Sequence, residues 1–344
     1  MKLRKPNINS LIAKSLLPKG EGILKIGYEL YNGSLKFNRL PRMNLLIILF
    51  IGFLMLNVPP ALAQAETDSA EYYYKLGKEH FNAKNYEKAL ADFNKSLEYE
   101  DSHVNAISHI GMSYFRLEKY GKALEWLDKS INLDGSNAEV HFLRGLTHES
   151  LQKYDEALGD YNAAIARNSE RARYFYKRGN VKLKLDKAEG AVDDFSGAIK
   201  LDPKEETYYH DRALAYIQLQ ELNSAMKDLD KAIGYNKDFA EAYHNRGLIL
   251  KMIGNLEEAL SNYDQAIKLN SNLTGAYISR ANVKYKLGQY NPALEDYSTA
   301  IEQQEEPEAS LFISRAKCYF KLDKIAQANA DIEKALELDP KSAD

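Results

Sequence analysis

Residues 138–171 read AEVHFLRGLTHESLQKYDEALGDYNAAIARNSER, and segments with the same pattern fill most of the 344-residue chain. An alanine marks their register, because it recurs every thirty-four residues with one last step of thirty-five. A spacing this regular is typical of stacked copies of one small unit, not of a globular domain built around a catalytic pocket. The eight alanines are Ala89, Ala123, Ala157, Ala191, Ala225, Ala259, Ala293 and Ala328.

Small and large side chains recur within each copy in a pattern that predicts two packed helices. If positions are counted from Ala70, position 20 is always alanine, and positions 8 and 27 hold only glycine, alanine or serine. Positions 24 and 28 hold large apolar side chains on the same helix face as positions 20 and 27. We predict one helix over about positions 2–14 and a second over about positions 18–30, closed by turn residues such as Asp202-Pro203 and Asp134-Gly135.

This pattern resembles that of the tetratricopeptide repeat (TPR) family. In the first copy, Tyr73-x2-Leu76-Gly77-x2-His80 followed by Ala89-x3-Phe93 is similar to the family's W-x2-L-G-x2-Y and A-x3-F elements. The resemblance covers residues 70–342 and implies an all-α fold, a right-handed α-solenoid of eight TPR helix-turn-helix repeats. The repeats are expected at residues 70–103, 104–137, 138–171, 172–205, 206–239, 240–273, 274–308 and 309–342.

Position 21 predicts a terminal face in the last repeat. It is apolar in the first seven copies, where it is expected to pack on the next unit, but it is Asn329 in the eighth. A polar residue at this position indicates a surface in contact with solvent, and we expect the array to end there.

Charge is divided unevenly along the chain. The net charge is −3 over all 344 residues, and residues 1–42 hold nine Lys or Arg against Glu21 and Glu29, which gives +7. Residues 43–63 carry no charge, so residues 64–344 have a net charge of −10. Nucleic-acid binding needs clustered basic surface, and an acidic array therefore argues against it.

The residues needed for catalysis or metal binding are missing from the sequence patterns. There is no HExxH pair, no G-x-x-x-x-G-K-[ST] loop and no G-x-S-x-G turn among the residues, and His141 with His148 has only the ordinary spacing of positions 4 and 11 in repeat three. The single cysteine, Cys318, excludes an intrachain disulfide and a cysteine-based zinc site, and its position is Val181, Ala215, Ile249 and Val283 in repeats four to seven. We predict a non-enzymatic protein without cofactor or metal, with Cys318 in the core.

The segment before the repeats predicts export. Residues 45–56, LLIILFIGFLML, form an uncharged run that is short for a membrane span and typical of a signal peptide, and Ala61-Leu62-Ala63 is a small-x-small cleavage pattern. Residues 43–63 are therefore interpreted as a signal peptide cleaved before Gln64, or as an uncleaved anchor through residues 45–58, followed by a linker at 64–69. Residues 1–42 are either a genuine basic leader or lie upstream of a true start at Met43. Both interpretations place the array outside the cytoplasm, periplasmic, extracellular or membrane-anchored, because the positive residues precede the apolar run.

A row of arginines at position 7 has two interpretations. It could bind anions along the array, or each arginine could pair with the aspartate or asparagine that accompanies it at position 23 of the same repeat. We favour structural pairing. In the two repeats that lack the arginine, position 7 is Leu76 and Ile110, and position 23 is Trp126 in the second of them, although Asp92 remains in the first. The row is Arg144, Arg178, Arg212, Arg246, Arg280 and Arg315, with Asp160, Asp194, Asp228, Asn262, Asp296 and Asp331 at position 23.

The resemblance implies a concave groove lined by positions 2, 5, 6, 9, 12 and 13 of the first helices. Aromatic and aliphatic side chains at positions 5 and 12 suit the capture of a peptide or helix, although packing against a neighbouring repeat explains them equally well. We predict that a partner docks mainly along repeats one to four, with Phe115 and Phe142 near its centre. The candidate partner-binding residues are Tyr74, Lys78, Phe81, Phe115, Phe142, Tyr176, Asn180, His210, His244 and Tyr285.

Some TPR proteins use a carboxylate clamp to bind the acidic carboxyl termini of chaperones. That clamp requires lysine, asparagine and arginine at fixed groove positions, and only Asn245 matches, since His210 and Leu214 precede it and Gly275 and Ser279 follow it. Chaperone-tail binding of this kind is therefore not expected. The sequence predicts an exported TPR scaffold that binds a protein or peptide in its concave groove; the alternative is an accessory subunit of cell-envelope polysaccharide or cell-wall machinery with a glycan ligand.

Overall fold

The computed structural model describes residues 60–340, with side chains from residue 68 onward, and in this range it holds sixteen helices and no strand. The predicted all-α solenoid of eight helix pairs is confirmed. The first helices of the pairs are α4 (Pro60–Asn82), α6 (Val104–Arg116), α8 (Ala138–Ser150), α10 (Ala172–Lys184), α12 (Glu206–Gln218), α14 (Ala240–Met252), α16 (Thr274–Lys286) and α18 (Ala309–Lys321). The second helices are α5 (Tyr86–Tyr99), α7 (Tyr120–Leu133), α9 (Tyr154–Arg167), α11 (Ala188–Leu201), α13 (Leu222–Tyr235), α15 (Leu256–Leu269), α17 (Tyr290–Glu302) and α19 (Ile325–Leu338).

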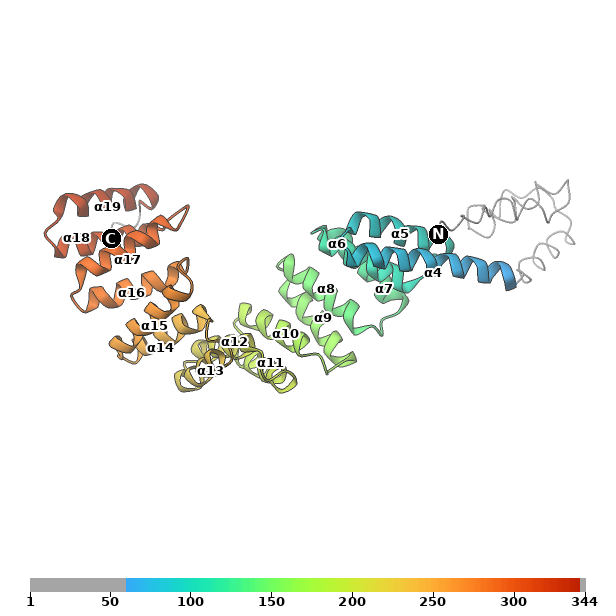
Figure 1. The fold of residues 1–344 in the computed structure, drawn as a ribbon, viewed down its shortest axis with the longest axis horizontal. Helices are drawn as coiled ribbons and strands as arrows, with labels where there is room; N and C mark the ends of the chain where they lie inside the picture. Colours follow the sequence, from blue (N-terminus) through green and yellow to red (C-terminus); the bar gives the residue numbers. More distant parts are fainter. Residues whose placement is uncertain (1–59, 341–344) are drawn as a thin grey trace, which may run out of the picture.

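The helix pairs follow one another along an arch (Figure 1). Each first helix packs on the second helix of its own repeat, and from α6 onward also on that of the repeat before it. First helices also contact one another directly, α4 with α6, α6 with α8, α10 with α12 and α14 with α16. Since neighbouring elements approach more closely on the inside of a curve, the first helices line the concave side.

The prediction of a linker at residues 64–69 is corrected, because these residues are helical. They belong to α4, which begins at Pro60 and is longer than any other helix of the described range. The basic leader, the apolar run at 45–58 and Met43 lie outside the described residues. None of the helices within residues 60–340 is both long and apolar enough to span a bilayer.

The small residues lie where the sequence pattern requires close helix contact. The alanines of position 20 are 0–3% exposed in all eight repeats. A Cβ atom added to Gly247 would lie 2.5 Å from Cε1 of Tyr263, which occupies position 24 of the same repeat and is itself 0% exposed. In the five repeats with glycine at position 8, a large side chain from the second helix therefore packs directly against the backbone of the first, and in the other three repeats position 8 is alanine.

The turn inside every repeat uses a left-handed residue at position 15. Its φ is +91° at Gly254 and +76° at Gly288, but the other six copies place an ordinary side chain in this conformation, with φ between +54° and +61°. Only glycine adopts this region without steric cost, so six repeats hold the turn through the packing of the helices on either side. These six residues are Lys84, Glu118, Gln152, Asp186, Gln220 and Asp323.

The eighth repeat presents the predicted terminal face. Asn329 is exposed, whereas its seven apolar counterparts are buried or half-buried. Position 24 also differs, since Ile332 is 45% exposed and the other seven side chains at this position are 0–2% exposed. No described helix packs on this side of α18 and α19, and that explains the exposure of both residues.

Candidate functional site: the concave face of the first helices

The arginine row is an internal element of the fold. In five repeats the guanidinium at position 7 donates hydrogen bonds to the buried aspartate at position 23, and in the sixth it donates to Asn262. In repeat four, for example, Nε of Arg178 lies 2.9 Å from Oδ2 of Asp194. The aspartates are 2–6% exposed, so these pairs are largely removed from water. The interpretation as paired residues is confirmed, and the row offers no free guanidinium face for an anion.

Each arginine also makes a second contact that the sequence pattern did not reveal. Its Nη1 donates to the side chain at position 25 of the preceding repeat, as in the 2.6 Å bond from Arg144 to Asp128 and the 2.9 Å bond from Arg212 to the Ser196 hydroxyl. One arginine thus links the two helices of its own repeat to the second helix before it. The acceptors at position 25 vary between Asp, Asn and Ser, and this variation conceals the pattern in the sequence.

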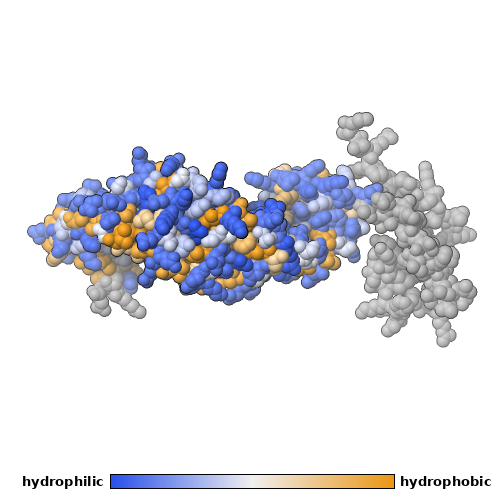
Figure 2. Space-filling view, turned by 90° about the horizontal axis from the view of Figure 1, so that it is seen from below, coloured by the Kyte–Doolittle hydropathy of each residue, from blue (hydrophilic) through white to orange (hydrophobic). Residues whose placement is uncertain are grey.

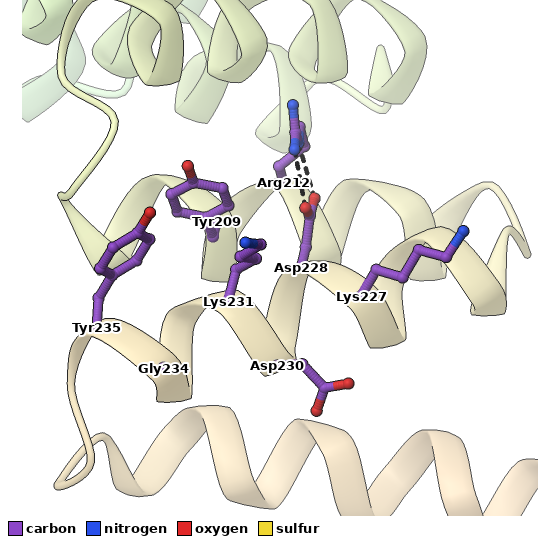
Figure 3. Close-up of a pocket in the computed structure, with 8 residues that line it drawn as sticks. All are labelled: Tyr209, Arg212, Lys227, Asp228, Asp230, Lys231, Gly234 and Tyr235. Atoms are coloured by element: carbon purple, nitrogen blue, oxygen red, sulfur yellow. Dashed lines mark hydrogen bonds and ion pairs between the residues drawn. The ribbon is translucent and has the colours of Figure 1, made fainter.

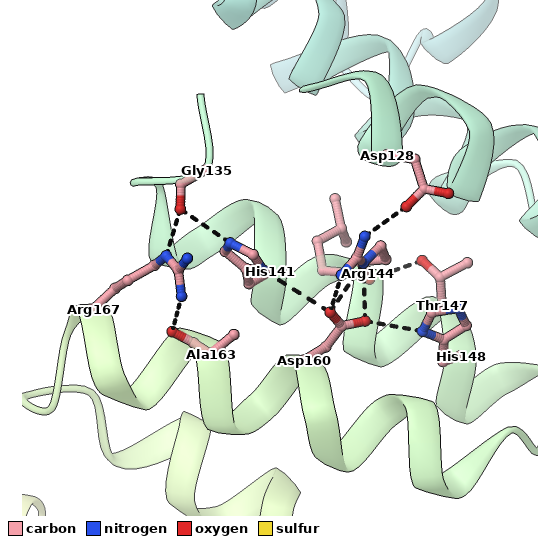
Figure 4. A network of polar contacts seen from close by, with 10 residues as sticks. Asp128, Gly135, His141, Arg144, Thr147, His148, Asp160, Ala163 and Arg167 are labelled. Atoms are coloured by element: carbon pink, nitrogen blue, oxygen red, sulfur yellow. Dashed lines mark hydrogen bonds and ion pairs between the residues drawn. The ribbon is translucent and has the colours of Figure 1, made fainter. Parts of the chain in front are cut away.

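A second basic side chain contacts the buried aspartate in several repeats. In repeat three, Nδ1 of His148 lies 2.9 Å from Oδ2 of Asp160, and Arg144 binds the same carboxylate (Figure 4). Repeat one has no arginine, and there Nδ1 of His80 lies 2.6 Å from Asp92. Asp92, which had no partner in the predicted pairing, is therefore also held by the helix opposite.

Three of the candidate groove residues are buried between repeats. Tyr74 is 9%, Phe142 is 4% and His210 is 9% exposed. The Phe142 ring lies 4.7 Å from the ring of Tyr174 in the next repeat and beneath the Arg173 guanidinium. The expectation that Phe142 lies near the centre of an accessible docking site is corrected by this burial. Tyr74 and His210 likewise contact the following repeat, through His109 and Asn245.

The remaining candidates are accessible. Lys78 is exposed, and its ammonium group lies 5.5 Å from the centre of the Tyr74 ring. Six others are half-buried, with part of each side chain open to solvent along α4, α6, α10, α14 and α16; they are Phe81, Phe115, Tyr176, Asn180, His244 and Tyr285. The structure therefore leaves position 12 as the main accessible aromatic position, through Phe81, Phe115 and Tyr285.

Polar links between successive first helices were not predicted. The side chain at position 5 bonds to that at position 6 of the next repeat in three consecutive junctions. Tyr176 donates to Asp211 at 2.8 Å, His210 Nε2 lies 2.8 Å from the Asn245 amide, and His244 Nε2 lies 3.0 Å from the Ser279 hydroxyl. These links fix the spacing of the first helices and hold part of the groove floor rigid.

Electrostatics along the groove follow from burial and nearby lysines. Burial lowers the pKa of His244, and the charge of Lys251 lowers it further. Burial likewise lowers the pKa of His109, with Lys78 contributing in the same direction. Burial raises the pKa of Tyr176 to about 12, and the nearby Asp211 carboxylate adds to the increase. The groove therefore holds neutral imidazole and phenol groups beside positive lysines at neutral pH.

No arrangement suited to catalysis is evident in the described part of the chain. A depression of about 650 Å³ lies between α12 and α13, but its Arg212 and Asp228 bind each other and its two lysines point apart (Figure 3). Within residues 68–340 no group of three or more His, Cys, Asp or Glu side chains is placed to hold a metal ion. Cys318 is 0% exposed, and burial raises the pKa of its thiol to about 11, so it is a core residue as predicted.

The outer surface is mainly hydrophilic. On the face shown in Figure 2, apolar side chains form small patches separated by polar ones. The most exposed large apolar side chains are Phe320 at 66%, Tyr72 at 61% and Met252 at 56%. Two of these three, Phe320 and Met252, occupy groove positions 12 and 13.

Comparison with protein families gives several matches to repeat models. Models described as tetratricopeptide repeat or TPR repeat match residues 142–206, 213–254, 240–273 and 309–342. A model for subunit 3 of the anaphase-promoting complex, or cyclosome, matches residues 55–130 and 93–164. No sequence among the curated proteins matches this chain.

Solved structures with the same fold are numerous and distant in sequence. A tetratricopeptide repeat protein from Parabacteroides merdae is 22% identical, with a TM-score of 0.57, and the match covers 69% of this chain and 93% of that one. The Cut9–Hcn1 hetero-tetramer of the APC/C is 14% identical, with a TM-score of 0.55, over 75% of this chain and 51% of that one. YrrB, described as a TPR protein with an unusual peptide-binding site, is 22% identical with a TM-score of 0.49, over 54% and 95%.

Proposed function

Because this chain is a tetratricopeptide repeat protein, we propose that it is a non-enzymatic scaffold that binds a protein or peptide partner along the concave face of its first helices. The observation that carries this proposal is the row of partly exposed aromatic side chains at position 12, of which Phe81 and Phe115 belong to adjacent repeats. Such rings bury a large area for few rotatable bonds, and aromatic anchors often dominate the energy of an interface.

Polar links between the first helices of repeats four to seven support a preformed groove in that part of the array. The polar links from Tyr176 to Asp211, from His210 to Asn245 and from His244 to Ser279 hold successive first helices at fixed spacing. A preformed surface loses little conformational freedom on binding, which favours affinity for an extended ligand.

The binding function predicts that Phe81→Ser combined with Phe115→Ser weakens partner capture at least tenfold, or about 1.4 kcal/mol. Both rings are half-buried and pack at the edge of the core clusters of repeats one and two, so their loss removes contact area from the groove and also some packing within the repeat. The measurement is the amount of partner that copurifies with the tagged full-length chain from its own cells, quantified by mass spectrometry. Circular dichroism checks that the variant keeps its helical content.

Leu133→Ser combined with Leu201→Ser is a matched control on the second helices. These leucines are 47% and 40% exposed, on α7 and α11. Capture should be unchanged in this variant. If the control loses the partner and the groove variant keeps it, the partner lies on the convex side and the proposal fails.

We also propose that the scaffold acts outside the cytoplasm. The support is the apolar run at 45–56, the small-x-small pattern at Ala61-Leu62-Ala63 and the positive residues before them. The partner would then be a protein of the cell envelope or of the exterior.

Export predicts that the mature chain begins at Gln64. The measurement is amino-terminal sequencing of the protein recovered from periplasmic, secreted and membrane fractions. Recovery with its membrane segment intact in the membrane fraction would favour the anchored form, and recovery of the intact amino terminus in the soluble cytosolic fraction would refute export.

A further inference from the structure

Charge is separated between the two layers of helices in repeats six to eight. The first helices α14, α16 and α18 carry eight Lys or Arg side chains and a single carboxylate, Glu241. The second helices α15, α17 and α19 carry nine carboxylates and two lysines. The array is acidic as a whole, and yet the concave layer of its last three repeats is strongly basic.

Half of these cations are already engaged inside the repeats. Arg280 and Lys284 bind the buried Asp296, Arg315 binds Asp331, and Arg246 binds Asn262 and Asp230. The other four have no hydrogen bond and no ion pair to any described residue, and they lie at groove positions 9, 12 and 13. They are Lys251, Lys286, Lys317 and Lys321, of which the last three are exposed.

The middle of the groove is different, because its charges are neutralised within the face. Glu149 in repeat three accepts a hydrogen bond from Lys184 at 3.1 Å and lies 3.7 Å from Lys177. Glu139 is bound by Arg173 of the next repeat. The unpaired positive charge of the concave face is therefore greatest in repeats six to eight.

Stabilisation of helix ends does not account for this accumulation. Lysines in the last turn of a helix interact favourably with the helix dipole, and Lys251, Lys286 and Lys321 are so placed. However, Lys317 precedes the last turn of α18, and of the three second helices only α15 has a basic residue in its last turn, Lys268. The basic residues follow the concave layer, not helix ends in general.

Apolar side chains lie among these lysines. Phe320 is 66% exposed and Met252 is 56% exposed, and Tyr285 is half-buried beside Lys286 in the chain. On such a surface the lysines can contact carboxylates of a bound peptide, and an aromatic ring can pack on an apolar side chain between those carboxylates. Three first helices about 10 Å apart would span about 20 Å, which is about six residues of an extended peptide.

We propose that the concave face of repeats six to eight binds an acidic peptide segment, rich in Asp and Glu and carrying an apolar residue, through Lys251, Lys286, Lys317, Lys321 and Phe320. This inference rests on the proposed function and specifies the chemistry of the partner. The four lysines contact the carboxylates of the peptide, and Phe320 packs against its apolar side chain. The basic groove section, as we call these five residues, lies in repeats six to eight, whereas Phe81 and Phe115 lie in repeats one and two.

The test is fluorescence anisotropy with the full-length chain and two labelled 14-residue peptides. One alternates Glu and Ser around a central Phe, and the other has Gln in place of every Glu. We expect the Glu peptide to bind at least about tenfold more tightly at low salt, with the difference shrinking as salt is raised. A preference below about twofold would overturn the inference.

The variant Lys286→Gln, Lys317→Gln, Lys321→Gln should reduce the preference for the Glu peptide to about threefold or less. The matched control is Lys88→Gln, Lys200→Gln, Lys268→Gln, which removes three exposed and unpaired lysines from second helices and should keep the preference. Equal preference in the two variants would overturn the assignment of the site. Equally tight binding of a twelve-residue oligothymidine would assign the surface to nucleic acid instead.

These outcomes separate the inference from the proposed function. If the unsubstituted chain shows no preference for the Glu peptide but partner capture still depends on Phe81 and Phe115, only the inference about acidic peptides is overturned. If substitutions in the groove leave partner capture unchanged, the proposed function is overturned.

Discussion

Replacing Asp296 by alanine is expected to lower the free energy of unfolding of the C-terminal repeats by about 3 kcal/mol. The Asp296 carboxylate is 3% exposed and is bound by two cations, Arg280 at 2.6 Å and Lys284 at 2.8 Å. Burial opposes the charged form of Arg280, but its hydrogen bonds to Asp296 and Asp264 outweigh that effect and raise its pKa. Without Asp296 two positive charges remain in a partly buried position with one exposed carboxylate to offset them.

Asp264→Ala is the matched control, because it removes the other carboxylate from the same arginine. Asp264 also lies 2.6 Å from Arg280, but its side chain is 61% exposed, so its loss should cost no more than about 1 kcal/mol. The measurement is urea unfolding followed by circular dichroism, with hydrogen exchange to locate the destabilised repeats. Equal effects of the two substitutions would contradict the assignment of Asp296 as the structural partner.

Gly247→Leu is expected to be at least as damaging, at about 3 kcal/mol or more. A Cβ atom alone at this position would lie 2.5 Å from the Tyr263 ring, which is 0% exposed. A leucine would therefore force the ring and the second helix of repeat six away from the first. Because each repeat stabilises its neighbours in a solenoid, the damage should extend to repeats five and seven.

Gly234→Leu provides the comparison for this effect. Gly234 also lies in a helix, α13, but nothing lies within 4 Å of a Cβ atom placed there. Replacing a helical glycine by a good helix former should raise stability by about 0.5–1 kcal/mol. If both leucine variants melt at the same temperature, the tight contact at position 8 is not what holds the helices of a repeat together.

The sequence predicted the helices well because every repeat carries its own copy of the packing rule. Alanine at position 20 and a small residue at position 8 recur in register, so a repeat whose own pattern is ambiguous can be assigned from the other copies. The pairing of Arg178 with Asp194 could also be inferred, since the two residue types occur together. The start of α4 could not be inferred, because Pro60 and the residues after it belong to no repeat.

Two features of the turns and junctions carry no sequence signature. The left-handed turn residue is glycine in only two of eight copies, at Gly254 and Gly288, and lysine or another ordinary residue elsewhere, as at Lys84. The second acceptor of each arginine varies in type, from Asp128 to Ser196. In both cases the surrounding packing decides the conformation. Because several residue types satisfy that packing, no single residue type marks these positions in the sequence.

The groove was predicted less completely than the fold. Position 5 faces the concave side, but it also lies at the junction between repeats, so Phe142 is covered by Tyr174 of the next repeat. Position 12 has fewer such neighbours, and Phe115 remains partly open. Sequence periodicity assigns both positions to the same side of the helix. Whether a side chain there is buried or accessible depends on how closely the next repeat approaches, and the sequence does not give that distance.

Site-specific crosslinking tests most directly whether the partner occupies the concave face. A photoreactive phenylalanine would replace Phe115 in the groove or, in a second version, Tyr235 on the second helix α13, where 45% of the side chain is exposed. Irradiation of the full-length chain in its own cells should give a crosslinked partner from position 115 and none from position 235. A partner crosslinked from position 235 alone would contradict the proposal that the groove of the first helices is the binding surface.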